Sequence, residues 1–367
     1  MSINLKKISL LLAIACVIFL AWYFSNITIY IVLALILSLM CSPVKHLFLK
    51  IKIKKIKLSN GIATVLAMLS VLLLLGGVLY LILPPLAHQI NAIANLDQHQ
   101  ISTALESPLH SVDYYLKKYN LIAEDEEVKN IIISTTLEYV RKINVSSFFG
   151  GVIHGLASLF LSIFSILFIA FFLLLDFTKL QTTFIRMLPN EYQQEMTNTF
   201  LKSKKLLSNY FVGLAVEMLL VGLLGFTVLS LLKIENALLI GVISGIMVII
   251  PYIGPIISFA IACFLAVTGA FIIDPSANFS MIILKLFSTF LLCRLLDNFF
   301  LQPYIASKSV KAHPLEVFLV ILIAGMLAGI PGMMLGIPVY TFIRVFAKEF
   351  FRNSNFIQIL TAKIDPK

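Results

Sequence analysis

The final third of the chain, residues 237 to 349, is almost wholly apolar, yet proline and glycine interrupt it twice. The interruptions are PYIGP at residues 251–255 and GIPGMMLGIP at residues 329–338. A helix broken inside a bilayer leaves backbone N–H and C=O groups that lipid cannot satisfy, so such breaks persist only where protein or a water-filled cavity surrounds them. The pattern therefore predicts broken helices around a buried region that is partly polar.

The composition of the whole chain indicates the same environment. Hydrophobic residues make up 60% of the 367 residues, charged residues only 13%, and the mean hydropathy is +0.99. Soluble domains carry about a quarter charged residues. We predict an all-α polytopic membrane protein whose partner is the lipid bilayer. It would have about eight membrane segments, two of them broken or re-entrant helical hairpins, and an external amphipathic helical segment.

The formal net charge of +10 does not indicate nucleic-acid binding, because the basic residues lie next to apolar runs rather than on a soluble domain. Residues 45–57 contain six lysines and no acid, and residues 176–205 contain five basic residues and three acids. The positive-inside rule places both loops in the cytoplasm. Residues 88–149 carry eight acids and five bases, which favours the external side.

These patterns divide the chain into five parts. The apolar run at 8–24 is long and lacks a small-residue cleavage site, so we interpret it as a retained first span, with both termini in the cytoplasm. Further spans are predicted at 27–43, 61–87, 150–175 and 207–232. The parts are N-terminal spans (1–87, with the basic loop 45–57), an external segment (88–149), central spans (150–236, with the loop 176–205), a C-terminal core (237–349) and a cytoplasmic tail (350–367).

The positions of two lysines distinguish between two possible topologies of the C-terminal core. If residues 237–273 and 314–348 each fold back as a hairpin, Lys308 and Lys311 lie in the cytoplasm; if each is one continuous span, both lysines lie outside. The positive-inside rule favours two hairpins that enter from opposite sides. Oppositely oriented broken helices occur in inverted-repeat transporters, although a true internal repeat stays open.

The charged residues at positions 217, 294, 297 and 316 fall inside predicted spans and need an explanation. A charge at mid-membrane costs about 2.5 to 3.5 kcal/mol. Arg294 and Asp297 are helical neighbours, so an internal ion pair and a role in substrate or ion coupling are both open. Glu217 needs a partner from another helix, water or a proton, and either proton coupling or a neutral interface carboxyl fits it. Glu316 fits the first turn of a helix.

No sequence motif of an enzyme or a metal site is present. The chain has no HExxH, Walker A, GxSxG or GxGxxG element, and its four cysteines have no CxxC spacing. We therefore predict no enzymatic activity, no cofactor and no metal.

Three segments resemble the autoinducer-2 exporter family, whose members are also described as PerM-like permeases. They are residues 243–258, 297–317 and 324–343. The shared features are a Pro-aromatic-x-Gly-Pro turn, Asp-Asn followed by Pro, a His-Pro pair at 313–314, and a glycine-rich close ending in Pro. The resemblance implies a multi-pass protein of the bacterial inner membrane that forms a homo-oligomer, with a pentamer as one candidate, and moves small molecules or ions. Glu316 departs from the family pattern.

The leading hypothesis is a secondary transporter or exporter of a small polar metabolite or signalling molecule. A cation/proton antiporter is the first alternative, and a membrane scaffold that does not transport is the second. The residues predicted to line the substrate or ion pathway are Pro251, Tyr252, Gly254, Pro255, Arg294, Asp297, Asn298, Pro303, Gly329, Pro331, Gly332, Gly336 and Pro338. Glu217 and Asp297 are the candidates for proton coupling.

Overall fold

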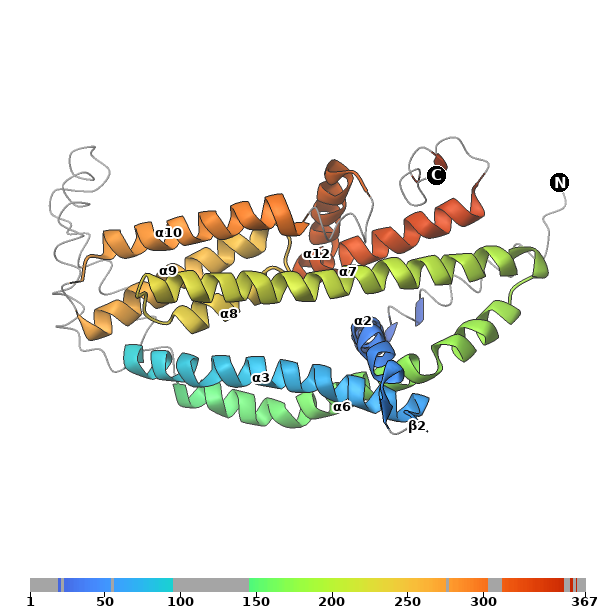
Figure 1. Ribbon diagram of the computed structural model, residues 1–367, viewed down its shortest axis with the longest axis horizontal. Helices are drawn as coiled ribbons and strands as arrows, with labels where there is room; N and C mark the ends of the chain where they lie inside the picture. Colours follow the sequence, from blue (N-terminus) through green and yellow to red (C-terminus); the bar gives the residue numbers. More distant parts are fainter. Residues whose placement is uncertain are drawn as a thin grey trace. The chain divides into compact units, whose positions relative to one another are not determined.

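The structure, a computed structural model, describes residues 19–20, 23–53, 56–94, 145–274, 277–302, 312–352, 357–358 and 361. Helices make up nearly all of this part of the chain, so the predicted all-α class is confirmed (Figure 1). The elements in chain order are α2 (Ser25–Lys50), β1 (Lys52–Ile53), β2 (Ile56–Lys57), α3 (Asn60–Ala94), α6 (Val145–Arg186), α7 (Asn190–Leu231), α8 (Ala237–Met247), α9 (Ile253–Ile273), α10 (Phe279–Leu296), the π-helix η1 (Asp297–Leu301) and α12 (Pro314–Phe350). The strands β1 and β2 form one short antiparallel pair.

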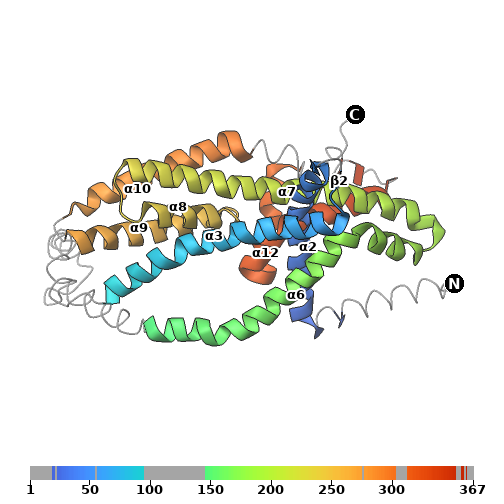
Figure 2. The ribbon, with the colours of Figure 1, turned by 60° about the horizontal axis from the view of Figure 1, so that its bottom comes forward.

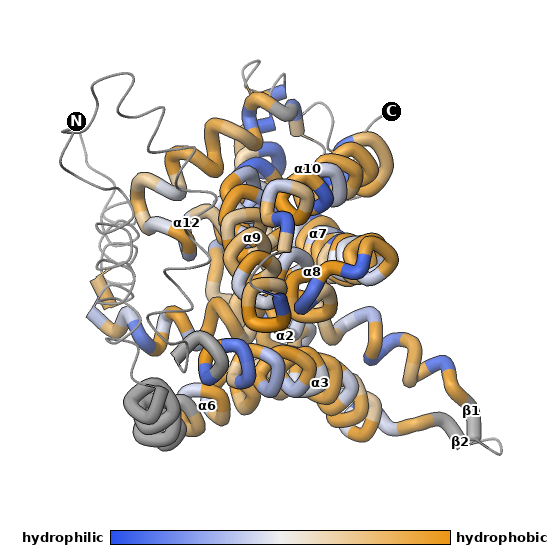
Figure 3. The backbone as a smooth tube through the Cα atoms, turned by 90° about the vertical axis from the view of Figure 1, so that its left-hand side faces the viewer, coloured by the Kyte–Doolittle hydropathy of each residue, from blue (hydrophilic) through white to orange (hydrophobic). Residues whose placement is uncertain are grey.

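Within the described residues, seven helices are long and apolar enough to cross a membrane. They are α2, α3, most of α6, α7, α9, α10 together with η1, and α12, while α8 is apolar but only 11 residues long. Apolar residues predominate along the labelled helices (Figure 3). Large apolar side chains also lie on the surface, among them Phe160 and Leu327 at 72% and 82% exposure. An apolar surface of this kind is suited to lipid.

The helices are longer than the spans predicted from the sequence. α3 continues through Pro84 and Pro85 to Ala94, although each proline removes one helical hydrogen bond. The predicted loop 176–205 is almost entirely helical. α6 continues to Arg186 and α7 begins at Asn190, so only residues 187–189 lie between the two helices. Most of the predicted first span at 8–24 and most of the external segment 88–149 lie outside the described residues.

The chain forms two compact units. Unit 1 comprises Met1–Leu73, Gly155–Phe211 and Thr341–Lys367, and unit 2 comprises Leu74–His154 and Val212–Tyr340. In unit 1, α2, the start of α3 and α6 come together (Figure 2), and small residues such as Ala34, Ala67 and Ala170 let them pack closely. A salt bridge of 2.9 Å between Lys202 and Glu349 joins α7 to the end of α12.

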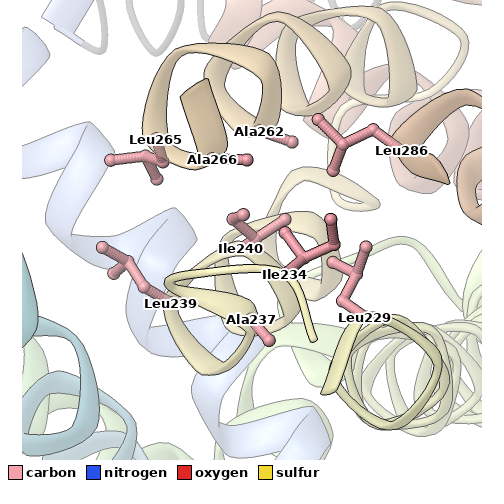
Figure 4. Close-up of a cluster of buried hydrophobic side chains, with 9 residues drawn as sticks. All are labelled: Leu229, Ile234, Ala237, Leu239, Ile240, Ala262, Leu265, Ala266 and Leu286. Atoms are coloured by element: carbon pink, nitrogen blue, oxygen red, sulfur yellow. The ribbon is translucent and has the colours of Figure 1, made fainter. Parts of the chain in front are cut away.

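The core of unit 2 is a cluster of nine buried apolar residues from the end of α7, the turn after it, and α8, α9 and α10. Figure 4 shows these nine side chains gathered between the helices that carry them. Glycines bring α7 and α8 into close contact, because a Cβ at Gly241 would lie only 2.7 Å from the backbone N of Phe226. This close packing fixes the helices that carry the predicted polar residues.

Candidate functional site

The first break in the C-terminal core is a tight turn between α8 and α9, which lie side by side (Figure 1). Tyr252 adopts a left-handed backbone with φ 63°, and the Gly254 N–H donates to the Ile250 carbonyl at 2.9 Å. Gly254 packs directly on the Met247 carbonyl, where a Cβ would clash. Pro255 lies in the first turn of α9, where its missing N–H costs nothing. The turn thus covers residues 248–252, slightly before the predicted 251–255.

The second break lies at Ala328 and Gly329, where α12 loses helical geometry. Gly329 has φ 60° and ψ −143°, a conformation almost restricted to glycine. Residues 330–338, predicted to belong to the break, are helical, because Pro331 falls in the first turn after the break and α12 tolerates Pro338. The break is therefore shorter than the sequence indicates, because it comprises Ala328 and Gly329 rather than residues 329–338.

The two arms of α12 fold back on each other across this break. The Tyr340 hydroxyl donates to a Glu316 carboxylate oxygen at 3.0 Å, although the residues are 24 apart in sequence. A straight helix would separate them by about 36 Å. Gly332 and Gly336 permit this approach, since a Cβ at Gly336 would lie 2.9 Å from the Ala324 Cβ and one at Gly332 would meet the Ala324 carbonyl. Both predicted hairpins are thus folded as hairpins; whether they re-enter a membrane stays a prediction.

The hairpins touch each other within unit 2. The ring of Tyr252, from the first turn, packs edge-on against Phe318 of α12, with the ring centroids 5.2 Å apart. Tyr252 is 45% exposed. The first break is therefore in contact with the part of α12 that precedes the second break.

A polar cluster forms where α10 passes into η1. The Arg294 Nη1 donates to Asp297 Oδ2 at 2.8 Å, as the three-residue spacing predicts, and Asp297 is only 3% exposed. The Gln302 Nε2 donates to the same oxygen at 3.1 Å. Residues five apart lie on different faces of an α-helix, but η1 has π geometry, in which the Gln302 N–H bonds the Asp297 carbonyl. The π-turn is what adds Gln302 to the site.

Glu217 of α7 completes this cluster. It is 7% exposed, and its carboxyl group lies within hydrogen-bonding reach of the Asp297 and Gln302 side chains and within the electrostatic range of Arg294. The main partner of Glu217 from another helix is therefore a second acid, Asp297. We call Glu217, Arg294, Asp297 and Gln302 the carboxyl cluster.

A cavity of about 50 Å³ adjoins the carboxyl cluster. Its walls come from α7, α8, α9, α10 and η1, and they include Pro255, Arg294 and Asp297 from the predicted pathway. Three hydroxyl residues that the sequence did not single out, Ser244, Ser258 and Thr289, also line it. Nothing in a sequence shows which face of an all-apolar helix turns inward, so these residues could not be selected.

The three hydroxyl groups have a defined orientation. Each donates its proton to a carbonyl of its own helix: Ser244 to Ile240 at 2.7 Å, Ser258 to Pro255 at 3.1 Å and Thr289 to Lys285 at 2.8 Å. A hydroxyl whose proton is engaged offers only its oxygen lone pairs to the cavity. The few polar groups of this largely apolar cavity wall therefore present mainly acceptors, with Arg294 as the cationic exception.

Other predicted pathway residues lie away from the cavity. Asn298 is exposed and does not line it, because it follows Asp297 on a different face of the helix. Gly329, Pro331, Gly332, Gly336 and Pro338 shape the second hairpin rather than the cavity wall. Pro303 lies outside the described residues.

Comparison with known proteins is consistent with this architecture. The chain is 29% identical to YueF of Bacillus subtilis over 209 residues (57% of this chain and 54% of YueF) and 26% identical to YrrI of the same organism over 213 residues (56% and 58%). It is 26% identical to MJ1177 of Methanocaldococcus jannaschii over 260 residues (70% and 74%). All three bear the name "Putative transport protein". The matches span little more than half the length of the two Bacillus relatives.

The match to a family is more extensive than the match to any of these relatives. Residues 8–352 match the family described as "AI-2E family transporter", and this range includes both hairpins and the carboxyl cluster. The resemblance noted from the three C-terminal segments is therefore confirmed over nearly the whole chain. This chain belongs to the AI-2E transporter family and is a multi-pass membrane protein.

Proposed function

We propose that this chain is a proton-coupled secondary transporter of a small polar solute, and that the carboxyl cluster is its proton site. The observation that carries the proposal is the contact between the Glu217 and Asp297 carboxyl groups in a site where both residues are less than 10% exposed. Two ionised carboxylates do not remain in contact in such a site, because like charges in a medium of low polarity repel strongly. A shared proton removes that repulsion.

The hydrogen-bond inventory of Asp297 supports a shared proton. Its Oδ2 accepts from Arg294 and Gln302, whereas its buried Oδ1 receives no donor among the described residues. A proton held between the two carboxyl groups supplies the missing donor. When that proton leaves, the bond of 2.8 Å from Arg294 Nη1 to Asp297 Oδ2 remains and places a positive charge beside the cluster.

The hairpins give a means of coupling this proton to a solute. Pro255 and Ser258, directly after the first break, line the same cavity as Asp297. A change of charge at Asp297 therefore acts on a wall built by the hairpin turn. Because binding pockets for drug-sized molecules measure about 300 to 1,000 Å³, a cavity of about 50 Å³ must widen to admit a metabolite. We propose that movement of the two hairpins widens it during transport.

Exchange of a cation for a proton is the second candidate, and the cavity itself favours it. About 50 Å³ is room for one or two water molecules or a small ion. The wall is largely apolar, and the oxygens that Ser244, Ser258 and Thr289 contribute to it suit a monovalent cation or a hydroxyl donor better than an anion. The same carboxyl pair would then bind proton and cation alternately.

The test is transport by the purified full chain in proteoliposomes with an imposed pH gradient. Flux of labelled small polar solutes is measured in one arm, and proton movement in response to a sodium gradient without solute is measured in the other. We expect Glu217→Gln and Asp297→Asn to abolish flux driven by the pH gradient in whichever arm the wild-type protein is active. Solute flux identifies the first candidate and solute-free sodium/proton exchange the second.

The matched control is Glu235→Gln, which removes an exposed carboxylate outside the cluster in the turn between α7 and α8. It should leave flux unchanged. If Glu217→Gln retains full flux driven by the pH gradient, the proton site lies elsewhere. If the wild-type protein shows transport in neither arm, both transport proposals fail and the result supports a membrane scaffold that does not transport.

We propose a location in the inner membrane with both termini in the cytoplasm, and assembly as a homo-oligomer. The basic residues around the end of α2 support the orientation through the positive-inside rule. Reporter fusions that are active only in the cytoplasm, placed at the C-terminus and after Asp274, test it. Activity at position 274 equal to that at the C-terminus would contradict the predicted topology.

A further inference from the structure

Unit 1 contains a second polar cavity, separate from the carboxyl cluster, that the transport proposal does not use. It measures about 210 Å³ and lies between α2, α6 and the first half of α7. Its polar wall includes Ser42, Lys45, Asn60 and Lys204, and its apolar wall is formed by leucines of α2 and α6. A volume of this size fits a charged headgroup rather than a whole drug-sized ligand.

A kink in α6 creates this cavity. Asp176 leaves helical geometry with φ −118° and ψ 22°, so carbonyls before it turn away from their helical partners. The Lys45 Nζ donates to the Leu174 carbonyl at 2.7 Å, and the Asn60 Nδ2 donates to the Leu175 carbonyl at 3.3 Å. A cation at the carboxyl end of a helical segment is favoured by the helix dipole. These bonds hold Lys45 in the interior, where the residue is only 8% exposed.

The cavity has more positive than negative charge. The Lys45 ammonium group has three donors, and Leu174 O is the only acceptor it meets among the described residues. Lys204 lies 4.2 Å above the centroid of the Phe177 ring, not against a carboxylate, and it is close enough to Lys45 to repel it. The nearby acid, Asp176, pairs with Lys179 at 2.8 Å, and its attraction for Lys45 is smaller than the repulsion from Lys204. Two buried or partly buried ammonium groups thus face one cavity, and neither forms a salt bridge with a carboxylate in the part of the chain that the structure describes.

We propose that this cavity binds an anionic phosphate ester through Lys45 and Lys204. Lysine binds phosphate as a point charge, and the spare ammonium protons match the phosphate oxygens. Ser42 and Asn60 add neutral polar groups beside it. Basic pockets between membrane helices bind anionic lipid headgroups in this way, and the leucines of the cavity wall are suited to an acyl chain. A soluble phosphate ester has the same chemistry, so the experiment distinguishes the two sources.

Binding is measured on the purified full chain in neutral detergent by native mass spectrometry. Phosphatidylglycerol, zwitterionic phosphatidylcholine and glycerol phosphate are added in separate arms. We expect Lys204→Gln to weaken binding of the phosphate ligand about fivefold, the effect of one ammonium group near an anionic headgroup. Lys205→Gln is the matched control, because Lys205 is the next residue but is exposed and does not line the cavity. Lys204→Arg keeps the charge and should keep binding.

Each outcome decides the proposal. Selective binding of phosphatidylglycerol that weakens in Lys204→Gln but not in Lys205→Gln supports a lipid ligand, and binding of glycerol phosphate that weakens in the same way supports a soluble one. Equal binding of phosphatidylcholine and phosphatidylglycerol overturns the proposal, and so does an equal effect of Lys204→Gln and Lys205→Gln. If Lys204→Gln does not fold, Lys204→Arg compared with Lys205→Gln still tests the proposal, since loss of binding in Lys204→Arg contradicts it.

Discussion

Gly329→Ala isolates the cost of the backbone turn that folds α12 into a hairpin. A Cβ at Gly329 would meet nothing within 4 Å, so the substitution creates no clash. The cost comes from the backbone alone, because φ 60° with ψ −143° is nearly closed to residues that carry a Cβ. Such conformations cost about 1 to 3 kcal/mol. For a unit of this size, that loss lowers the melting temperature by about 2 to 12 °C.

Thermal unfolding of unit 2 can be followed with a dye that fluoresces on reaction with thiols. Cys263 and Cys293 are partly buried in unit 2, so replacing Cys16 and Cys41 with alanine makes the signal specific to this unit. The melting temperature of Gly329→Ala is compared with that of the same cysteine background.

Gly76→Ala in α3 is the matched control, because a Cβ there also meets nothing within 4 Å but the backbone is helical. Alanine should stabilise that site by about 0.5 to 1 kcal/mol. If both alanine variants raise the melting temperature, the left-handed turn at Gly329 is refuted, and with it the folded-back arrangement of α12.

Two further predictions address the hairpins. Tyr340→Phe removes the hydroxyl that binds Glu316 at 3.0 Å, and we expect a loss of about 1.5 kcal/mol in unfolding free energy, the low end for a bond to a charged group, measured by the same thiol assay. An unchanged melting temperature would mean that the arms do not meet there. In a cysteine-free background, Tyr252→Cys should react with a polar maleimide in intact membrane vesicles, because a break that lines a wet cavity is reachable from water. Phe160→Cys, on an exposed apolar helix face, should stay unlabelled; equal reactivity at both positions would contradict a water-lined turn.

Local spacing made part of the site predictable. Arg294 and Asp297 lie three residues apart, and their 2.8 Å ion pair is what helical geometry gives for that spacing. The Pro and Gly residues at 251–255 likewise indicated a turn within a few residues of its actual place. These features depend only on neighbours in the chain, so a single sequence carries them.

Features that depend on contacts between helices were not predictable. Glu217 and Asp297 are 80 residues apart, and the sequence could say only that Glu217 needs some partner. Ser258 and Thr289 face the cavity because of how α9 and α10 rotate about their axes. In an evenly apolar helix no polar stripe marks the buried face, because lipid removes the need for one. The inward face of such helices is therefore set by packing that the sequence does not display.

The Asp-Asn pair at 297–298 illustrates why a motif and a site are different things. Consecutive residues on a helix point about 100° apart, so both cannot face one narrow cavity. Asp297 turns inward and is 3% exposed, while Asn298 is exposed. The π-turn that begins at Asp297 then brings Gln302, rather than Asn298, to the carboxylate. The amide group that bonds the Asp297 carboxylate thus comes from a residue five positions away, and only one residue of the Asp-Asn pair belongs to the carboxyl cluster.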